Sequence, residues 1–296
     1  RELAAKHKEL LADLTKKYGI PAHYLLAFWG LETNFGGYKG KMPVLDSLAT
    51  LACDPRRSTF FSKELITAVK LLEAQSLDQE RMVGSWAGAM GHTQFMPSAY
   101  AAYAVDGDND GQINLWDSEA DALTSAANFL AQLGWQPGFR WGREVMLPES
   151  FDYRLLGYSN RKSVTEWNDM GVTKAKGDAL GESDIASYLV MPAGHEGPTF
   201  LAYPNFRVIM RWNNSEFYAI AVGRLADRIA GDGKMIASLP DLPAYSRNHI
   251  IALQQSLNAR GIDVGGADGI LGPATREGIR QFQLSQDMVA DGFPSL

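Results

Sequence analysis

One acidic residue, Glu32, stands among aromatic side chains in a stretch with helical punctuation. Pro21 favours the start of a helix and the Gly36-Gly37 pair favours its end. On such a helix the carboxylate shares its face with positions three or four residues away, which are Phe28, Trp29 and Phe35. A poorly solvated carboxyl group keeps its proton to a higher pH, so Glu32 is a candidate general acid. The alternative is a helical glutamate at the rim of the core, paired with a nearby lysine or arginine.

The segment 84–97 mixes glycines and alanines with polar Ser85 and Gln94 and with bulky Met90 and Phe95. Small residues let the backbone approach a partner closely, and a glutamine amide both donates and accepts hydrogen bonds. This mixture is typical of a lining for a polar, flat-faced ligand such as a sugar. A glycine-rich loop packed into the core would have the same composition.

Residues 106–117 have the pattern of an EF-hand loop, with acids at positions 1, 3, 5 and 12, which are Asp106, Asp108, Asp110 and Asp117. Gly111 occupies the position of the sharp turn, Gln112 needs to offer only its backbone carbonyl, and Asn114 can bind directly or through water. The pattern predicts a structural Ca²⁺ site, with a solvated acidic turn as the alternative. Aspartate replaces the usual glutamate at position 12, which predicts a modest affinity.

Composition excludes several classes of protein. The chain of 296 residues is 46% apolar and 21% charged, as expected of a soluble globular protein with more than one domain. A formal net charge of −6 without any Lys/Arg-rich run argues against nucleic acid as a partner. No apolar run approaches the roughly 20 residues that span a bilayer. The single cysteine, Cys53, cannot form an internal disulfide, and its apolar neighbours predict that it is buried.

Helical periodicity dominates the chain, so we expect a mainly α fold. A small β-rich region is expected within 185–212, including 206–212, and a helix capped by 213–215 is expected over 217–229. Residues 233–244 are linker-like. Two helices over 247–260 and 273–286 then form a minimal bundle, in which Ala267-Asp268-Gly269 and Ala290-Asp291-Gly292 echo each other. The expected parts are therefore 1–232, the linker 233–244 and 245–296.

Two resemblances follow from these motifs. The C-terminal part resembles the peptidoglycan-binding domain of bacterial wall enzymes, through Leu253-Gln254-Gln255-Ser256-Leu257-Asn258, the segment from Ala267 to Thr275, and Phe282-Gln283. The first 230 residues resemble the lytic murein transglycosylases of the B type, glycoside hydrolase family 103, especially the soluble form with an appended wall-binding domain. The motifs are the Glu32 helix, 56–61, 88–91, 94–98, the calcium loop, and 211–215 with Tyr218.

The resemblance implies a lysozyme-like helical catalytic core with a small β-containing region and a small C-terminal helical bundle. It implies that Glu32 is the catalytic acid and base. It also implies a glycan cleft lined by Ser85, Met90, Gln94, Phe95, Tyr203, Trp212, Asn213 and Tyr218, with Arg56 and Arg57 meeting the stem peptide. Relatives usually have tyrosine where this chain has Trp212, so stacking on a sugar is kept but a phenolic hydrogen bond is lost.

The implied reaction is cleavage of the β-1,4 bond between MurNAc and GlcNAc in peptidoglycan without consumption of water. Ordinary glycosidases use two carboxylates about 5 to 10 Å apart, whereas only one carboxylate here lies in a motif of the right character. A single glutamate then serves as acid and afterwards as base, and the C6 hydroxyl of MurNAc closes a 1,6-anhydro ring. A hydrolytic muramidase and a non-catalytic wall-binding protein are the alternatives.

The resemblance further implies peptidoglycan strands and stem peptides as partners, the periplasm of a Gram-negative bacterium as the location, and no organic cofactor. The chain begins at Arg1 in a helix-like pattern, which suggests a processed or trimmed product from which any export signal is missing. The sequence leaves the oligomeric state, the choice between chain ends and chain interiors, and a lipid anchor undetermined.

Overall fold

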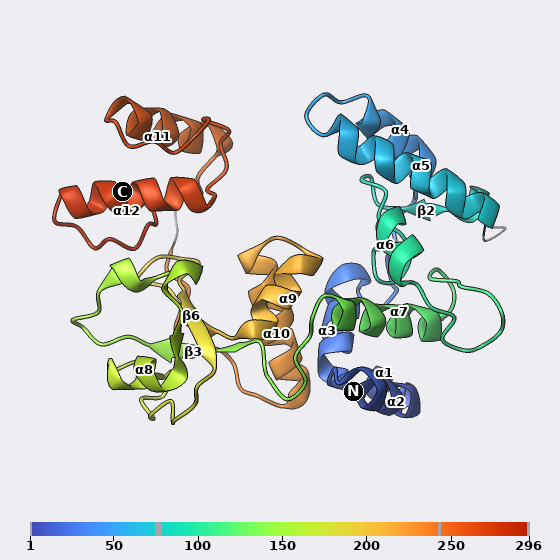
Figure 1. Cartoon of the computed structure of the whole chain (residues 1–296), viewed down its shortest axis with the longest axis horizontal. Coiled ribbons are helices and arrows are strands. Elements are labelled where there is room, and N and C mark those ends of the chain that lie inside the picture. Colours follow the sequence, from blue (N-terminus) through green and yellow to red (C-terminus); the bar gives the residue numbers. More distant parts are fainter. Residues whose placement is uncertain (1, 75–78, 242–243, 295–296) are drawn as a thin grey trace. The chain divides into compact units, whose positions relative to one another are not determined.

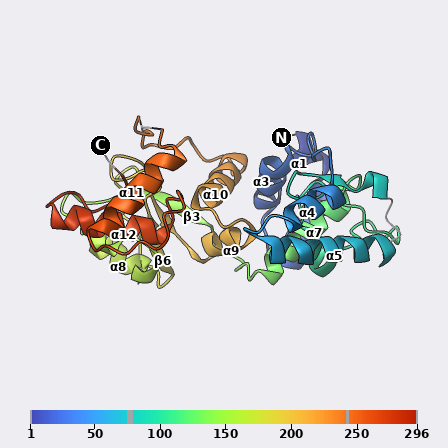
Figure 2. The same cartoon turned by 90° about the horizontal axis from the view of Figure 1, so that it is seen from above.

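The computed structural model describes residues 2–74, 79–241 and 244–294. The chain divides into two compact units, Arg1–Phe139 with Arg207–Gly233, and Arg140–Phe206 with Lys234–Leu296 (Figures 1 and 2). This division differs from the predicted parts 1–232, 233–244 and 245–296, because the β-rich segment groups with the C-terminal segment rather than with the helices that precede it in the sequence. The predicted domain boundaries stay a prediction.

The first unit is helical. Its helices are α1 (Glu2–Lys6), α2 (Lys8–Tyr18), α3 (Ala22–Thr33), α4 (Val44–Ala52), α5 (Ser58–Ala74), α6 (Pro97–Tyr103), α7 (Glu119–Gln132), the end of α9 (Pro204–Trp212) and α10 (Glu216–Ala230). The short strands β1 (Met42–Pro43) and β2 (Val83–Gly84) pair antiparallel, and η1 (Gln79–Arg81) precedes β2. Ser215 caps α10 by accepting from the Tyr218 amide, as its sequence predicts.

Helix α3 is the central element of this unit, because it is apolar on every side rather than amphipathic. Six consecutive residues are buried, from Tyr24 to Trp29, and the helix packs against α2, α7 and α10. It ends at Thr33 because Asn34 and Phe35 both adopt positive φ, 49° and 57°. The expectation that Phe35 continues the helical face of Glu32 is therefore wrong.

A buried cluster in the helical unit joins α4 and α5 to the segment 82–104. Its centre contains Leu48, Phe61, Met90 and Phe95, with the partly buried ring of Trp212 packed against it. Cys53 is exposed at the end of α4, so the prediction that it is buried is wrong. Its apolar neighbours Leu51 and Ala52 are themselves only partly buried in this last turn.

The second unit contains an antiparallel five-stranded sheet in the order β4-β6-β7-β3-β5. The strands are β3 (Gly142–Met146), β4 (Lys162–Ser163), β5 (Thr173–Lys174), β6 (Ala186–Val190) and β7 (Thr199–Ala202), and the short helices beside them are η2 (Tyr153–Leu155), η3 (Tyr158–Asn160) and α8 (Val164–Asp169). Central strand β7 is buried along its whole length, and Leu189 and Leu201 pack with Trp167 in the core of the sheet. A capping box between Ser163 and Glu166 starts α8.

The expected β structure over 206–212 is absent, because this segment forms the body of α9. Pro204 stands at the first helical position, where its fixed φ suits a helix. Phe206, Ile209 and Trp212 recur at three-residue spacing, which marks a helical face rather than the alternation of a strand. The helix carries Trp212 into the first unit.

The remaining helices are α11 (Arg247–Ala259) and α12 (Pro273–Ser285), close to the ranges that their sequence predicts. Leu257, Val264 and Ile279 form their small core. Among the described residues, no helix combines the length and apolar character needed to cross a bilayer.

Candidate active site

Glu32 lies in the last turn of α3, where its carboxylate is half-buried. Two donors from the other end of the unit reach the same oxygen. The indole Nε1 of Trp212 donates to Oε1 at 3.0 Å, and the phenol of Tyr218 donates a short hydrogen bond to Oε1. No hydrogen bond from the described residues reaches Oε2. The carboxylate therefore has one oxygen held by the protein and one oxygen left for a substrate.

The pKa of Glu32 is raised above its ordinary value, because burial disfavours the charged form. The hydrogen bonds from Tyr218 and Trp212 act in the opposite direction and stabilise the carboxylate. Burial also raises the pKa of Tyr218 well above its ordinary value, so the phenol remains a donor at neutral pH. The predicted raised pKa of Glu32 is confirmed, and its cause is burial, which outweighs the two hydrogen bonds.

Trp212 has a role that its sequence position does not reveal. Its ring packs against Phe28 with centroids 4.6 Å apart, against Phe129 at 5.0 Å and against Phe95 at 5.5 Å. These contacts fix the indole so that its N–H points at Glu32. The sequence analysis assigned Trp212 only to stacking on a sugar. The signal for its role as a hydrogen-bond donor to Glu32 was an indole N–H at the end of an amphipathic helix.

The segment 84–97 folds back on itself beside α4, and its predicted site residues have different exposures. Ser85 Oγ accepts from the amides of Ala87 and Ala89, so it holds the turn. Met90 and Phe95 are buried and pair through their backbones. Gln94 has a φ of 51° and donates its amide to the carbonyls of Lys39 and Gly91 at 3.2 and 3.0 Å.

The other predicted binding residues are spread over the two units. Arg56 pairs with Asp54, and the Arg57 guanidinium lies over the rings of Phe60 and Phe61, at 4.4 and 5.1 Å from their centroids. Asn213 is exposed between α9 and α10. Tyr203 belongs to the second unit, where it is buried after β7 with the Arg143 guanidinium 5.5 Å from its ring.

His92 connects helix α3 to the acidic loop 106–117. Its Nδ1 accepts from Trp29 Nε1 at 3.0 Å, its carbonyl accepts from the Thr33 hydroxyl at 2.8 Å, and its amide donates to the Leu115 carbonyl. Burial lowers the pKa of His92 to about 4, so the ring is neutral at pH 7 and can accept. This residue was not predicted as part of the site.

The predicted calcium loop brings three of its acids together. Carboxylate oxygens of Asp106, Asp108 and Asp110 lie within 4.8 Å of one another. Asp106 accepts from the amides of Asn109 and Gly111, and Asp110 accepts from the amide of Gln112. Hard oxygen donors at this separation fit Ca²⁺, which takes six to eight oxygens at about 2.3–2.6 Å.

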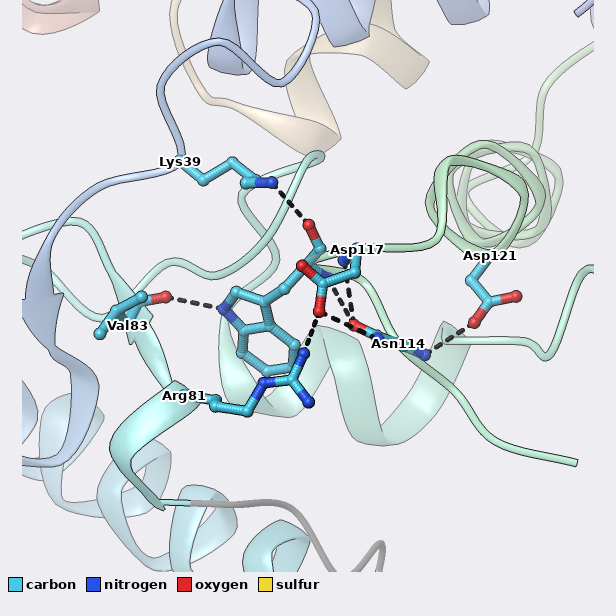
Figure 3. A network of polar contacts seen from close by, with 7 residues as sticks. Lys39, Arg81, Val83, Asn114, Asp117 and Asp121 are labelled. Carbon is cyan, nitrogen blue, oxygen red and sulfur yellow. Dashed lines mark hydrogen bonds and ion pairs between the residues drawn. The ribbon is translucent and has the colours of Figure 1, made fainter. Parts of the chain in front are cut away.

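Asp117, the fourth predicted acid, is engaged elsewhere. It forms an ion pair with Arg81 and accepts from the Asn114 amide group (Figure 3). Lys39 donates to the Trp116 carbonyl at 2.6 Å, and Trp116 Nε1 donates to the Val83 carbonyl at 2.8 Å. The end of the acidic loop is thus tied to strand β2 and to the segment after helix α3.

Asp121, in the first turn of α7, holds this loop and was missed in the sequence analysis. Its side chain is buried, and its two oxygens accept from the amides of Gly107 and Asn114 at 2.7 Å each, so it joins both ends of the loop. Burial raises the pKa of Asp121, and the nearby charges of Asp108 and Asp106 raise it further. An acid in the first turn of the helix after the loop was the signal that could have identified it.

Comparison with known proteins defines the class of this molecule. Residues 1–227 match the transglycosylase SLT domain, and residues 246–295 match the peptidoglycan binding domain. The chain therefore belongs to the transglycosylase SLT domain family and carries a C-terminal peptidoglycan binding domain. The expected mainly α, lysozyme-like fold is confirmed.

Three relatives illustrate the similarity. Membrane-bound lytic murein transglycosylase B of Escherichia coli is 36% identical over 226 residues, which are 76% of this chain and 61% of that protein, so the chain spans less than two thirds of its length. SltB3 from Pseudomonas aeruginosa, solved in complex with NAG-NAM-pentapeptide, has a TM-score of 0.96 and 44% identity over 99% of this chain and 79% of that one. The Escherichia coli lytic transglycosylase Slt35, solved in complex with calcium, has a TM-score of 0.66 and 33% identity over 77% of this chain and 72% of that one.

Proposed function

We propose that this chain is a lytic transglycosylase that cleaves the β-1,4 bond between MurNAc and GlcNAc in peptidoglycan and leaves a 1,6-anhydroMurNAc end. The observation that carries the proposal is the Glu32 carboxylate, half-buried with two donors on Oε1 and none on Oε2. Family membership supports the same reaction class, as do the names of the relatives.

Glu32 begins as the acid. Burial keeps its carboxyl group protonated to a higher pH than an exposed glutamate. Because Oε1 already accepts from Trp212 and Tyr218, the proton resides on Oε2, from which it passes to the glycosidic oxygen as the bond to C1 of MurNAc breaks.

Glu32 then acts as the base. The two hydrogen bonds on Oε1 stabilise the new carboxylate, and Oε2 takes the proton of the C6 hydroxyl while the oxygen of that hydroxyl bonds to C1. The proton lost in the first step is regained in the second, so the carboxyl group returns to its starting state and no water is consumed. One carboxylate suffices because the substrate supplies the nucleophile, in contrast to the paired acids of hydrolases.

The predicted cleft residues of the helical unit are proposed to form the glycan-binding surface, and they are Ser85, Met90, Gln94, Phe95, Trp212, Asn213 and Tyr218. A glycan contact of Tyr203, which belongs to the other unit, stays a prediction. Arg56 and Arg57 are proposed to meet the acidic groups of the stem peptides, which suits guanidinium groups on an exposed turn. The exposed Asn213 offers both a donor and an acceptor to a sugar. For Met90 and Phe95, which are buried, the contribution is the shape of the surface beneath the glycan.

Ca²⁺ is proposed to be structural, held by Asp106, Asp108, Asp110, the Gln112 carbonyl and Asp117. The ion would neutralise repulsion between the clustered acids and so fix a loop that is linked through Leu115 to His92 and through Trp116 to Lys39. It lies outside the reaction itself, which needs only Glu32 and the substrate. No organic cofactor is part of the proposal, and the proposed location is the periplasm of a Gram-negative bacterium.

The mass of the products tests the reaction. Digestion of purified sacculi should release muropeptides whose MurNAc ends are lighter by one water than hydrolysed ends. Hydrolysed ends alone would identify a muramidase, and intact sacculi with bound protein would identify a non-catalytic wall-binding protein. Digestion in water enriched in ¹⁸O provides an internal control, because anhydro ends formed by ring closure incorporate none of the label.

A further inference from the structure

The C-terminal segment contains the same hydrogen-bonded turn twice. In the first turn, Gln254 Nε2 donates to Asp268 Oδ1 at 3.0 Å, and the amides of Gly269 and Ile270 donate to Gln254 Oε1 and Asp268 Oδ1, both at 2.9 Å. A buried glutamine on α11 thus clamps an Asp-Gly turn.

The second turn repeats these bonds atom for atom. Gln283 Nε2 donates to Asp291 Oδ1 at 2.9 Å, and the amides of Gly292 and Phe293 donate to Gln283 Oε1 and Asp291 Oδ1, both at 2.8 Å. The glycine φ angles, 78° for Gly269 and 71° for Gly292, agree as well. The echo of Ala-Asp-Gly in the sequence is therefore an internal structural repeat.

The second turn already binds a peptide segment of its own chain. The backbone amide and Nδ1 of His195 both contact Asp291 Oδ2, at 2.9 and 2.7 Å. Gly194 lies so close to Asp291 and Phe293 that a Cβ there would be 3.0–3.2 Å from them. The occupant thus combines a peptide N–H, a side-chain nitrogen donor and a backbone that fits closely against an apolar ring, and Asp291 is buried beneath it.

The first turn has the same chemistry and is open. Asp268 is exposed, and its Oδ2 accepts no hydrogen bond from the described part of the chain. The bond from Gln254 and the amide of Ile270 lower the pKa of Asp268, so the group is a carboxylate at neutral pH. Ile270, at the position of Phe293, is 63% exposed. An exposed apolar side chain and a carboxylate oxygen without a hydrogen bond therefore belong to the same turn, where Arg247 Nε donates to the Asp268 carbonyl at 3.0 Å.

We infer that the Asp268 turn is a ligand site for a short peptide, and that it binds a backbone N–H together with a neighbouring ammonium group at Oδ2 while Ile270 packs against the peptide backbone. The inference rests on the proposed function for its ligand, because peptidoglycan stem peptides carry small side chains and a diamino acid that supplies such an ammonium. The two turns thereby have different roles. The Asp291 turn holds the C-terminal helices against the Gly194-His195 segment, and the Asp268 turn binds the cell-wall peptide.

The test is cosedimentation of the full chain with intact sacculi, made in a Glu32→Gln background so that the substrate is not consumed. Asp268→Asn keeps Oδ1 for Gln254 and Ile270 but replaces the outer acceptor with a donor. It should weaken binding about tenfold or more, as expected for loss of a hydrogen bond to a charged group. Asp287→Asn is the matched control, since it makes the same change at an exposed aspartate outside both turns and should leave sacculus binding unchanged.

Two further measurements keep the inference falsifiable. Ile270→Gln changes an exposed side chain that takes no part in the hydrogen bonds of the turn, so it should also weaken binding without affecting folding. Glycan strands stripped of peptide by an amidase should bind the parent and Asp268→Asn equally. Equal binding of all variants to sacculi would overturn the inference, and an equal loss on stripped glycan would overturn the assignment to peptide.

Failure of the inference is distinguishable from failure of the proposed function. The wild-type chain and Asp268→Asn, each with Glu32 intact, should both convert soluble peptide-free glycan to anhydro products at the same rate. If neither produces them, the proposed reaction is wrong whatever the binding results are. If both produce them and Asp268→Asn still binds sacculi like its parent, only the peptide site is wrong.

Discussion

The indole Nε1 of Trp212 donates a 3.0 Å hydrogen bond to Oε1 of Glu32, although 180 positions separate the two residues. The indole ring is held between Phe28, Phe95 and Phe129, so its direction is set by packing. Phe28 belongs to the same helix as Glu32. The aromatic residues near Glu32 in the sequence therefore act partly through a distant tryptophan rather than by contact with the carboxylate alone.

Trp212→Phe should keep the aromatic packing and remove the donor. Because this bond stabilises the charged form, its loss should raise the pKa of Glu32 further and shift the alkaline limb of the pH–rate profile to higher pH. The rate of anhydro-product formation should fall about tenfold or more, since hydrogen bonds to charged groups contribute roughly 1.5–3 kcal/mol. Phe129→Leu, which alters the ring stack without touching Glu32, is the control. An unchanged pH profile in Trp212→Phe would contradict the assigned role.

Glu32→Gln should abolish cleavage while the chain stays folded. The pKa of Glu32 is raised from 4.5 in the folded state, so the folded state binds more protons than the unfolded state above that pH and loses stability as pH rises through the folded value. Glutamine does not titrate, so the variant lacks this dependence of stability on pH. The variant should match the wild type in urea unfolding at acid pH and exceed it in stability at neutral pH. Substantial turnover by the purified variant would refute the assignment.

His92→Phe should destabilise the helical unit by about 1–3 kcal/mol, because it leaves the buried Trp29 Nε1 without an acceptor. Urea unfolding at pH 7 measures the loss. Adding Trp29→Phe to His92→Phe removes the unpaired indole N–H. The double variant should therefore lose less unfolding free energy than the sum of the two single variants. The His92 contribution should also fade as pH drops from 6.5 toward about 4, since the unfolded state gains a proton that the folded ring resists.

Ca²⁺ should raise the thermal midpoint of the chain, and a chelator should reverse the effect. Asp110→Asn removes one anionic ligand from the group of three acids and should markedly lower the terbium affinity measured by luminescence titration. Asp241→Asn, outside the loop, should leave that affinity unchanged. Absence of terbium or calcium binding at millimolar metal would refute the proposal that the chain binds Ca²⁺. The catalytic assignment of Glu32 would stand unaffected.

Arg81→Gln should strengthen calcium binding. Arg81 pairs with Asp117 in the structure, and this carboxylate must turn toward the loop to act as the ligand at position 12 (Figure 3). Both side chains are more than half exposed, so the competing ion pair is worth at most about 1 kcal/mol, which corresponds to a gain of about fivefold or less in affinity. Calorimetry measures it, and Arg154→Gln, which breaks a similar exposed pair with Asp152, is the matched control.

The sequence by itself determined the features that depend on local chemistry. The acidic spacing of 106–117, the caps at Ser163 and Ser215, and the helices of the C-terminal segment follow from short-range geometry, which a few neighbouring residues fix. The motif at Glu32 located the candidate acid for the same reason. Local pattern misled where a short apolar run fits two periods, as in 206–212, which the structure folds as helix α9.

Only the tertiary structure decided how these features act together. The donors to Glu32, the neutral His92 beneath α3 and Arg81 on Asp117 all come from positions far from their partners in the sequence. The protonation state of a carboxyl group depends on which water is excluded and which donors arrive, and both are products of packing between distant segments. For this reason the sequence could nominate Glu32 as an acid, but the fold alone set which of its two oxygens is free to react.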